Sequence, residues 1–219
     1  MDGKLIVFEG IEGGGKTTQI QQTCDWLQKH LGSSAPAILT TKEPGGTALG
    51  RSLRKILLDS RLEEPIASQA ELLLFAADRA QHVETFLKPH LEQGAIILCD
   101  RFTDSTIAYQ GYGRGLDQDL IVQLNQIATG GLQSDLTLWF DLEVEKGLAR
   151  TQTRGEMDRM EQADLAFHQR VNQGFCELAS QAGDRIIRID AHLSLEQVSE
   201  KIQRVLSEHL KQWGFLLKS

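Results

Sequence analysis

A phosphate-loop pattern near the start of the chain limits what it can fold into. Residues Gly10 to Thr17 read GIEGGGKT, which matches the pattern G-x-x-x-x-G-K-[ST]. The pattern follows a short apolar run, residues 5–8, and precedes a segment with helical spacing of apolar residues. Glycines let backbone N–H groups turn inward around phosphate oxygens, and a helix that begins at the loop adds partial positive charge. A glycine-rich hairpin is the alternative, but the strand-to-helix context favours nucleoside triphosphate binding.

The residue types inside the loop suit a nucleoside triphosphate and its magnesium ion. Lys16 supplies a full positive charge for the donor phosphates, and the hydroxyl of Thr17 can ligate Mg²⁺. Glu9 closes the apolar run, so we expect it beside the metal with Thr17 and Asp100. The residues predicted to bind ATP are Gly10, Ile11, Glu12, Gly13, Gly14, Gly15, Lys16, Thr17 and Thr18.

Short apolar runs alternate along the chain with longer segments of helical spacing. Ile20, Cys24, Leu27 and Leu31 form one apolar stripe, and residues 195–206 contain a second. Repeated strand–helix–strand order implies right-handed crossovers and ligands beyond the carboxyl ends of the strands. We therefore expect an α/β fold, a doubly wound five-stranded parallel sheet with helices on both faces. The predicted strands are residues 5–8, 37–40, 95–99, 136–140 and 185–189.

The composition disfavours several classes of protein. A formal net charge of -7 argues against a protein that grips nucleic acid by charge, because that requires clustered lysine and arginine. The cysteines Cys24, Cys99 and Cys176 lack the paired spacing of disulfide frameworks or zinc sites, so a reducing compartment fits best. No apolar run approaches the roughly 20 residues of a membrane span. We expect a cytoplasmic protein with no nucleic-acid or membrane partner.

The third predicted strand ends in an acid followed by a base, Asp100 and Arg101. The acid can orient Mg²⁺ or its waters, and the arginine can hold a second phosphate. A solvated ion pair is the alternative, but the position in register with the phosphate loop favours a site. The D-x-x-G and Asn-Lys-x-Asp motifs of GTPases are missing from the sequence. The phosphate loop alone does not separate ATPases from small-molecule kinases.

Four further segments carry a family resemblance. They read KEPGGT (residues 42–47), LLFAADRAQ (73–81), DRFTDSTIAYQG (100–111) and RGEMDRME (154–161). In this order around a phosphate loop they resemble the bacterial thymidylate kinases over nearly the whole chain. The resemblance implies a P-loop NTPase fold with a small lid and a homodimer. It also implies phosphoryl transfer from MgATP to dTMP, giving ADP and dTDP for dTTP synthesis.

The resemblance assigns the acceptor site residue by residue. Phe75 matches the aromatic side chain that stacks on thymine, and Arg79 matches the arginine that hydrogen-bonds the base edge. A flat ring and a planar donor fork suit a pyrimidine with carbonyl acceptors. On periodicity alone, the leucines before Phe75 would favour a core position. The other implied substrate-binding residues are Glu12 at the sugar 3′-hydroxyl, Arg101 at the acceptor phosphate, Tyr109 beside the 2′ position, and Pro44, Thr106 and Gln110.

Catalytic arginines are expected from a lid, residues 144–163. Some thymidylate kinases place an arginine directly after the acid of the phosphate loop, but this chain has Gly13 there. It therefore resembles the bacterial subclass that delivers arginines from the lid, where Arg150 and Arg154 would share one side of a helix. The alternative is a solvated helical face that pairs arginines with glutamates. The predicted catalytic set is Lys16, Arg101, Arg154, Arg159 and Arg150.

Several points stay open at the level of sequence. Lys42 stands where the family more usually has arginine, and a lysine cannot supply a bidentate fork, so any ligand contact there is expected to be looser. The apolar segment 72–77 with Ile107 fits either core or dimer surface. Residues 1–219 are expected to form a single kinase domain. The alternatives are another nucleoside monophosphate or deoxynucleoside kinase, or a nucleotide-dependent switch or binding module.

Overall fold

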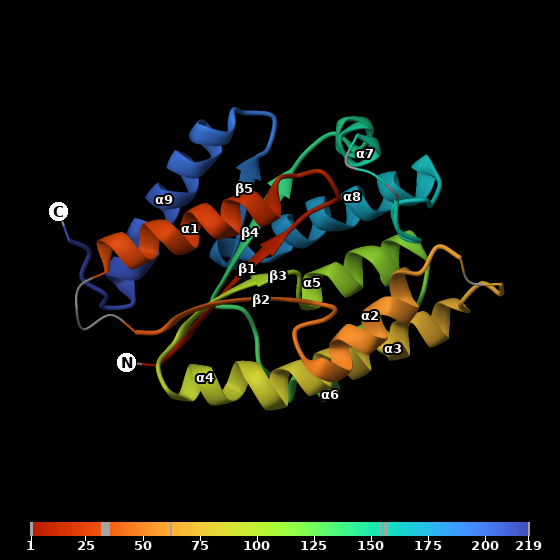
Figure 1. Ribbon diagram of the computed structural model, residues 1–219, viewed down its shortest axis with the longest axis horizontal. Coiled ribbons are helices and arrows are strands. Elements are labelled where there is room, and N and C mark those ends of the chain that lie inside the picture. The colour runs from red at the N-terminus through yellow and green to blue at the C-terminus, as the bar shows by residue number, and fades with distance from the viewer. Residues whose placement is uncertain (1, 32–35, 62, 154, 156, 219) are drawn as a thin grey trace.

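Five parallel strands form the centre of the molecule, whose computed structural model describes residues 2–31, 36–61, 63–153, 155 and 157–218. The strands lie in the order β2-β3-β1-β4-β5, which is the predicted doubly wound arrangement (Figure 1). β1 lies in the middle and pairs with both β3 and β4. The strands are β1 (Lys4–Glu9), β2 (Ile38–Lys42), β3 (Ile96–Asp100), β4 (Leu136–Asp141) and β5 (Ile186–Asp190).

Helices surround this sheet. α1 packs against α9, β2 and β3, whereas α8 packs against β4, β5 and the π-helical segment η2. α3 packs against α2 and α6 and continues into a second π-helical segment, η1. The elements are α1 (Lys16–His30), α2 (Ala48–Leu58), α3 (Ser68–His82), η1 (Val83–Leu87), α4 (Lys88–Glu92), α5 (Thr103–Thr106), η2 (Ile107–Gly113), α6 (Gln118–Thr129), α7 (Val144–Gln152), α8 (Leu165–Gln181), η3 (Gly183–Arg185) and α9 (Leu195–Gln212).

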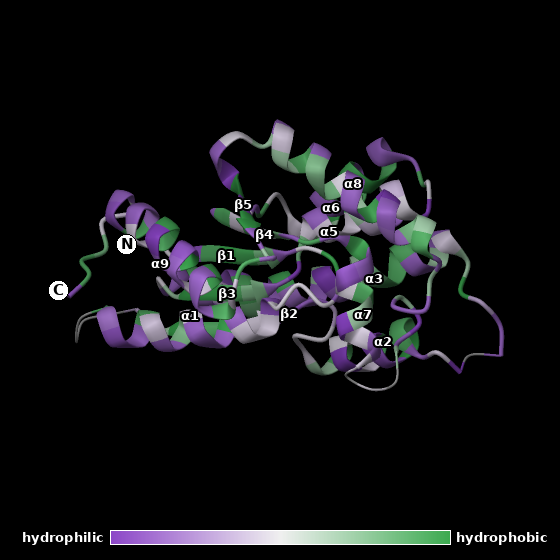
Figure 2. Cartoon of the chain, turned by 90° about the horizontal axis from the view of Figure 1, so that it is seen from above, coloured by the Kyte–Doolittle hydropathy of each residue, from purple (hydrophilic) through white to green (hydrophobic). Residues whose placement is uncertain are grey.

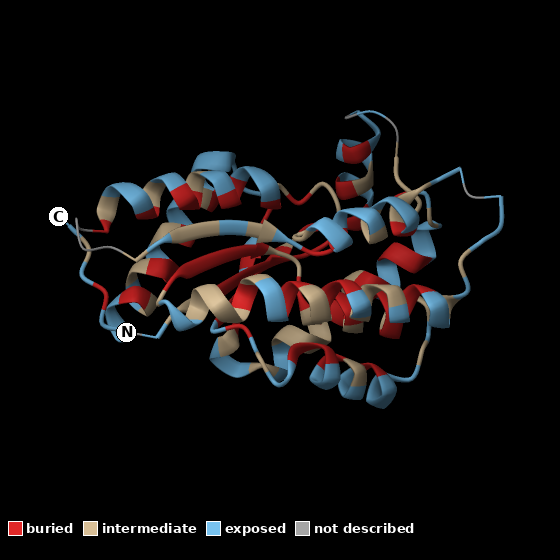
Figure 3. Cartoon of the chain, turned by 60° about the horizontal axis from the view of Figure 1, so that its bottom comes forward, coloured by how far each residue is buried: buried red, intermediate tan, exposed pale blue. Residues whose placement is uncertain are grey.

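The core follows from the alternation of side chains along the central strand. Ile6 and Phe8 join one buried cluster with Leu27 of α1, and Leu5 and Val7 join a second cluster with η1. Successive side chains of a strand point to opposite faces, so a run without polar residues is covered on both sides. Figure 2 shows these apolar strands between helices whose outer surfaces are hydrophilic. In Figure 3 the central strands are buried, whereas the edge strand β2 is only partly covered.

The parallel strands bring three predicted segments to one edge of the sheet. β1 runs into the phosphate loop, β3 ends at Asp100, and β4 leads to α7 at the start of the predicted lid (Figure 1). Chain segments that follow parallel strands meet at the carboxyl edge, where α/β folds bind ligands. The predicted ligand-binding segments therefore lie together.

The predicted elements agree closely with the observed ones. Each strand starts within one residue of its predicted position. α1 carries the first apolar stripe and ends at His30, so Leu31 is its cap and donates its N–H to Leu27. α9 carries the second stripe and begins with a capping box between Ser194 and Gln197. Within the described part of the chain, none of the helices has the length and apolar character needed to cross a membrane.

Candidate functional site

A cavity of about 590 Å³ opens at the carboxyl edge of the sheet. Its lining combines the phosphate loop, the turn after β2, one side of α3, the end of β3, η2 and part of the lid. Every predicted substrate-binding residue lies in this lining: Glu12, Pro44, Phe75, Arg79, Arg101, Thr106, Tyr109 and Gln110. The cavity therefore joins the predicted donor and acceptor ends in one space.

The side chain of Lys16 forms hydrogen bonds with the backbone at the start of the phosphate loop. The Nζ of Lys16 donates to the carbonyl oxygens of Gly10 at 2.9 Å and Ile11 at 2.8 Å. Burial, followed by the positive charge of Arg101, lowers the pKa of Lys16 to about 8. Gly15 precedes α1 with φ of 87°, a left-handed conformation that glycine adopts without strain. Gly10 and Ile11 contribute carbonyls and do not line the cavity, whereas the loop from Glu12 to Thr18 does.

Helix α7 rests directly on the phosphate loop. A Cβ at Gly13 would lie 2.2 Å from the carbonyl oxygen of Gly147, and a Cβ at Gly147 would lie 2.5 Å from that of Glu12. Contacts of this kind need glycine on both sides, because a side chain would push the two backbones apart. A side chain at position 13, such as an arginine, would require α7 to move. The glycine after the loop acid therefore allows α7 to lie close to the loop.

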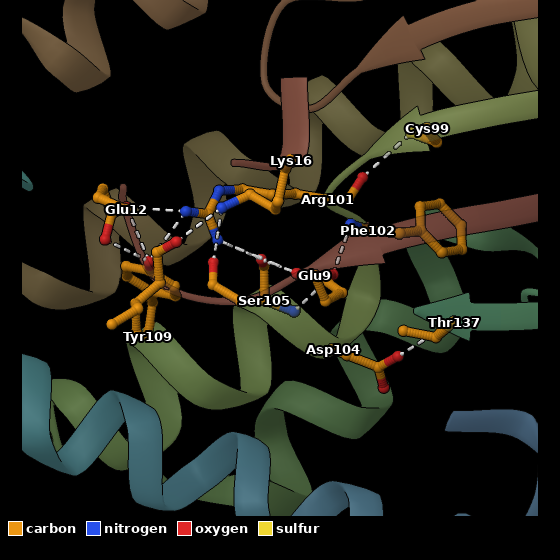
Figure 4. Close-up of polar contacts among 12 residues, drawn as sticks. Glu9, Glu12, Lys16, Cys99, Arg101, Phe102, Asp104, Ser105, Tyr109 and Thr137 are labelled. Atoms are coloured by element: carbon orange, nitrogen blue, oxygen red, sulfur yellow. Dashed lines mark hydrogen bonds and ion pairs between the residues drawn. The ribbon is translucent and has the colours of Figure 1, made fainter. Parts of the chain in front are cut away.

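Three polar side chains of the cavity lining meet one another (Figure 4). Arg101 Nη2 donates to Glu12 Oε1 at 2.8 Å and to the hydroxyl oxygen of Tyr109 at 3.0 Å. The Tyr109 hydroxyl in turn donates to the Glu12 carboxylate at 2.7 Å. Burial raises the pKa of Glu12, but Arg101 and Lys16 outweigh it and hold that pKa below its usual value. Glu12 is therefore ionised at neutral pH, and its cationic partner Arg101 is a partly buried residue of the cavity lining.

Glu9 holds the turn that presents Arg101 (Figure 4). Its fully buried carboxylate accepts hydrogen bonds from the backbone N–H groups of Phe102 at 2.8 Å and Ser105 at 3.1 Å. The Ser105 hydroxyl also donates to it, at 2.5 Å. Burial raises the pKa of Glu9 to about 7 despite the attraction of Arg101. Glu9 is not part of the cavity lining, in contrast to the expected position beside the metal, and that role stays a prediction.

Two of the predicted metal ligands do line the cavity, Asp100 and Thr17. The Oδ1 atom of Asp100 is buried without a hydrogen-bond partner, and Thr17 is exposed in the first turn of α1. No group of three or more His, Cys, Asp or Glu side chains in the described ranges could hold a metal by itself. Mg²⁺ commonly takes one or two protein ligands and completes its shell with water and substrate phosphates. The residues present fit that requirement.

The predicted base-binding end of the cavity is built on α3. Phe75 is half-buried and lines the cavity, so it is not an enclosed core residue. Arg79, one turn later, is almost fully buried and ties several elements together. It donates to Glu43 at 2.8 Å, to Thr106 and Asn125 at 2.7 Å each, and to the Phe102 carbonyl at 2.9 Å. These contacts use four of the five N–H groups of its guanidinium.

The lid arginines differ in where they point. Arg150 on α7 lines the cavity and donates to the Gly13 carbonyl at 3.2 Å. α7 ends at Gln152, and Arg154, which was expected to share a helical face with Arg150, lies outside the described residues. Arg159 is not in the cavity lining, because Glu71 at 2.6 Å and the Leu57 carbonyl at 2.7 Å hold its guanidinium. The structure therefore brings Arg150 to the site and does not bring Arg159.

The lining also contains residues that sequence reasoning did not single out. Arg54 on α2 lines the cavity and donates to the Pro44 carbonyl at 2.9 Å. Asp78 lines it too and accepts from the Gly45 N–H at 3.1 Å, and burial raises its pKa to about 6. Asp78 sits inside the quoted segment LLFAADRAQ, whereas no motif marks Arg54. Lys42, where the resemblance led us to expect arginine, is also in the lining.

Comparisons with known proteins identify the family of the chain. A family model described as Thymidylate kinase matches residues 8–202. A thymidylate kinase of Cyanothece sp. is 59% identical and aligns over 97% of this chain and 97% of its own length. One from Trichodesmium erythraeum is 56% identical over 99% of this chain and 100% of its own length. The crystal structure of thymidylate kinase from Ehrlichia chaffeensis superposes with a TM-score of 0.75 at 34% identity, covering 94% of this chain and 99% of that chain. The chain belongs to the thymidylate kinase family.

Proposed function

We propose that the chain transfers the γ-phosphoryl group of ATP to dTMP, giving ADP and dTDP. One observation carries the proposal: a single cavity holds the phosphate loop with Lys16 and also Arg101 and the base-binding end around Phe75. Phosphoryl transfer needs little covalent chemistry from the protein, so the rate comes from alignment of the two substrates and from nearby cations. The family match favours dTMP over the acceptors of other nucleoside monophosphate kinases.

The polar centre of the cavity suits the acceptor nucleotide. In the structure Arg101 Nη2 donates a hydrogen bond to Glu12. When dTMP binds, this nitrogen donates to the phosphate of dTMP instead. Glu12 is then free to accept from the sugar 3′-hydroxyl, and Tyr109 lies beside it at the position proposed to crowd a 2′-hydroxyl. After the exchange Arg101 faces the phosphate and Glu12 keeps hydroxyl donors, so neither group is left without a polar partner, which would be costly.

Magnesium is part of the proposal. The unpartnered Oδ1 of Asp100 and the exposed hydroxyl of Thr17 are the oxygen donors that support it. A bound Mg²⁺ would neutralise charge on the donor phosphates, and the remaining ligands would be phosphate oxygens and water. Glu9 is the third predicted metal residue, and its filled hydrogen bonds favour an indirect role through the Arg101 turn.

The segment 144–163 is proposed as the lid of this single-domain kinase. Arg150 is the lid cation that its position supports best, because it lies on the cavity next to the phosphate loop. Closure of a lid expels water and brings positive charge to the transferring group. Arg159 contributes only if its contact with Glu71 opens, and Arg154 remains a predicted catalytic residue.

A homodimer is proposed from two helices that leave apolar side chains exposed. Leu73 on α3 and Val122 and Ile127 on α6 are 56%, 54% and 77% exposed, and α3 packs against α6. Leu72, by contrast, belongs to the chain's own core. Exposed apolar side chains on helices that pack together support an association surface. Sedimentation equilibrium should show dimers of the native chain and monomers of Ile127→Asp, with Leu216→Asp as the exposed control; native monomers would contradict the proposal.

The cytosol is the proposed location, supported by three free cysteines.

The reaction is tested by separating the products of ATP, Mg²⁺ and dTMP by anion-exchange chromatography. We expect ADP and dTDP in equal amounts, a large loss of dTDP with Arg101→Gln, and native rates with Arg61→Gln, which changes an exposed arginine. ADP formed without dTDP would show an ATPase and contradict the proposed function.

A further inference from the structure

Glu71 lies behind the base-binding wall of the cavity. It is on α3, is fully buried, and does not line the cavity itself. Its Oε1 accepts from Gln110 Nε2 at 2.9 Å and from Arg114 Nε at 3.2 Å. Its Oε2 accepts from Arg114 Nη2 at 3.1 Å and pairs with Arg159 Nη2 at 2.6 Å. One carboxylate thus connects a residue of the cavity wall with two arginines.

The surroundings of Glu71 keep it ionised. Burial alone raises its pKa, but the hydrogen bonds from Arg114 and Gln110 and the two arginine charges outweigh burial and hold that pKa below its usual value. An ionised carboxylate can only accept hydrogen bonds. Whatever touches it must present a donor.

This requirement fixes the orientation of the Gln110 amide. The two ends of a glutamine amide have nearly the same shape, so a polar neighbour decides which end points where. The NH₂ end of the Gln110 amide donates to Glu71, and Gln110 is one of the residues that line the cavity. No side chain or backbone group in the described ranges donates to its Oε1. The carbonyl end of Gln110 is therefore the end left for a ligand in the cavity.

We propose that Glu71 is a positioning residue for base selection: it holds the NH₂ group of Gln110 so that Oε1 offers an acceptor to the pyrimidine. Thymine and uracil carry a donor at N3, whereas cytosine carries an acceptor there and would face Oε1 with an unpaired lone pair. Cytosine is rejected because the buried Oε1 of Gln110 would then face no donor and would lose its hydrogen bond altogether. The inference rests on the proposed function, since it places the acceptor base beside Gln110.

The test separates base selection from the contact of Glu71 with the lid. Dissociation constants of dTMP and dCMP are measured by isothermal titration calorimetry for the native chain, Glu71→Gln, Gln110→Ala and the double variant, and kcat is measured with dTMP. We expect the preference for dTMP over dCMP to fall at least about tenfold in each single variant. In the double variant it should fall no further, because Glu71 acts through Gln110. Arg159→Gln is the matched control, which changes kcat and leaves the preference unchanged.

An exchange variant covers the case in which Glu71→Gln folds poorly. Glu71→Gln combined with Gln110→Glu keeps one amide and one carboxylate in contact and still leaves an acceptor oxygen for the cavity. We expect it to keep the preference for dTMP, and loss of that preference would overturn the inference. An unchanged preference in Glu71→Gln, with a lower kcat, would reduce Glu71 to a lid anchor and overturn the inference alone. If the native chain makes no dTDP, both the proposed function and this inference fall.

Discussion

Replacement of Glu9 by glutamine should change how the stability of the protein depends on pH. Burial raises the pKa of Glu9 from 4.5 to about 7, so the folded state binds a proton more tightly than the unfolded state between these values. The native chain therefore loses stability as the pH rises through this window, and the loss stops above about pH 7. At 1.36 kcal/mol per pKa unit the whole loss is about 3 kcal/mol. Glu9→Gln removes the titration and keeps an acceptor for the Phe102 and Ser105 N–H groups.

The assay is urea unfolding of the native chain and Glu9→Gln at several pH values between 4 and 8. The stability of Glu9→Gln relative to the native chain should rise across the window by about 3 kcal/mol. Glu64→Gln, which changes an exposed glutamate, serves as the control and should show no such trend. A difference that stays constant with pH would show that the attraction of Arg101 cancels the effect of burial on the pKa of Glu9, and one that falls as pH rises would show that it exceeds burial; either result would refute the reasoning.

Three further predictions concern the site. Lys16→Ala should abolish turnover while dTMP still binds. In the native chain, kcat/KM for ATP should fall above about pH 8, because the ammonium group of Lys16 loses its proton there. A pH–rate profile measures this fall, and a flat profile would contradict the assignment. Phe75→Ala should weaken dTMP binding far more than ATP binding in calorimetry, and equal losses would indicate a core role. Asp100→Asn should raise the Mg²⁺ concentration needed for half-maximal rate at least about tenfold, and an unchanged requirement would remove Asp100 from the metal site.

The sheet could be predicted because its signals are local. Continuous apolar runs such as the one before Glu9 identify strands that are covered on both faces, and the phosphate-loop pattern fixes the first strand, turn and helix. Right-handed crossovers between such strands predict a doubly wound parallel sheet, whereas the order β2-β3-β1-β4-β5 came from the structure. Segments at the carboxyl edge were correctly expected to meet, and the predicted acceptor residues all line one cavity.

Side-chain partners that are far apart in sequence could not be predicted. The burial of Glu9 under the Phe102–Ser105 turn depends on contacts across 93 and 96 positions. The pairing of Arg159 with Glu71 also joins distant segments and removes from the cavity a residue whose motif indicated a catalytic role. Periodicity reports which face of an element is apolar, but it does not report which distant charge will find a partner. The close approach of Gly13 and Gly147 is a further case, since each glycine by itself permits many backbone conformations.

The central claim is that one cavity binds ATP and dTMP together for transfer between them. The most direct test is Mg²⁺-dependent ADP release from ATP with dTMP, dUMP, UMP, dCMP, AMP, GMP and thymidine each offered as the acceptor. The account predicts strong preference for dTMP and little ADP release without an acceptor. Release of ADP at the same rate without any acceptor, or with another nucleotide preferred, would contradict the acceptor site described for Arg101, Phe75 and Gln110.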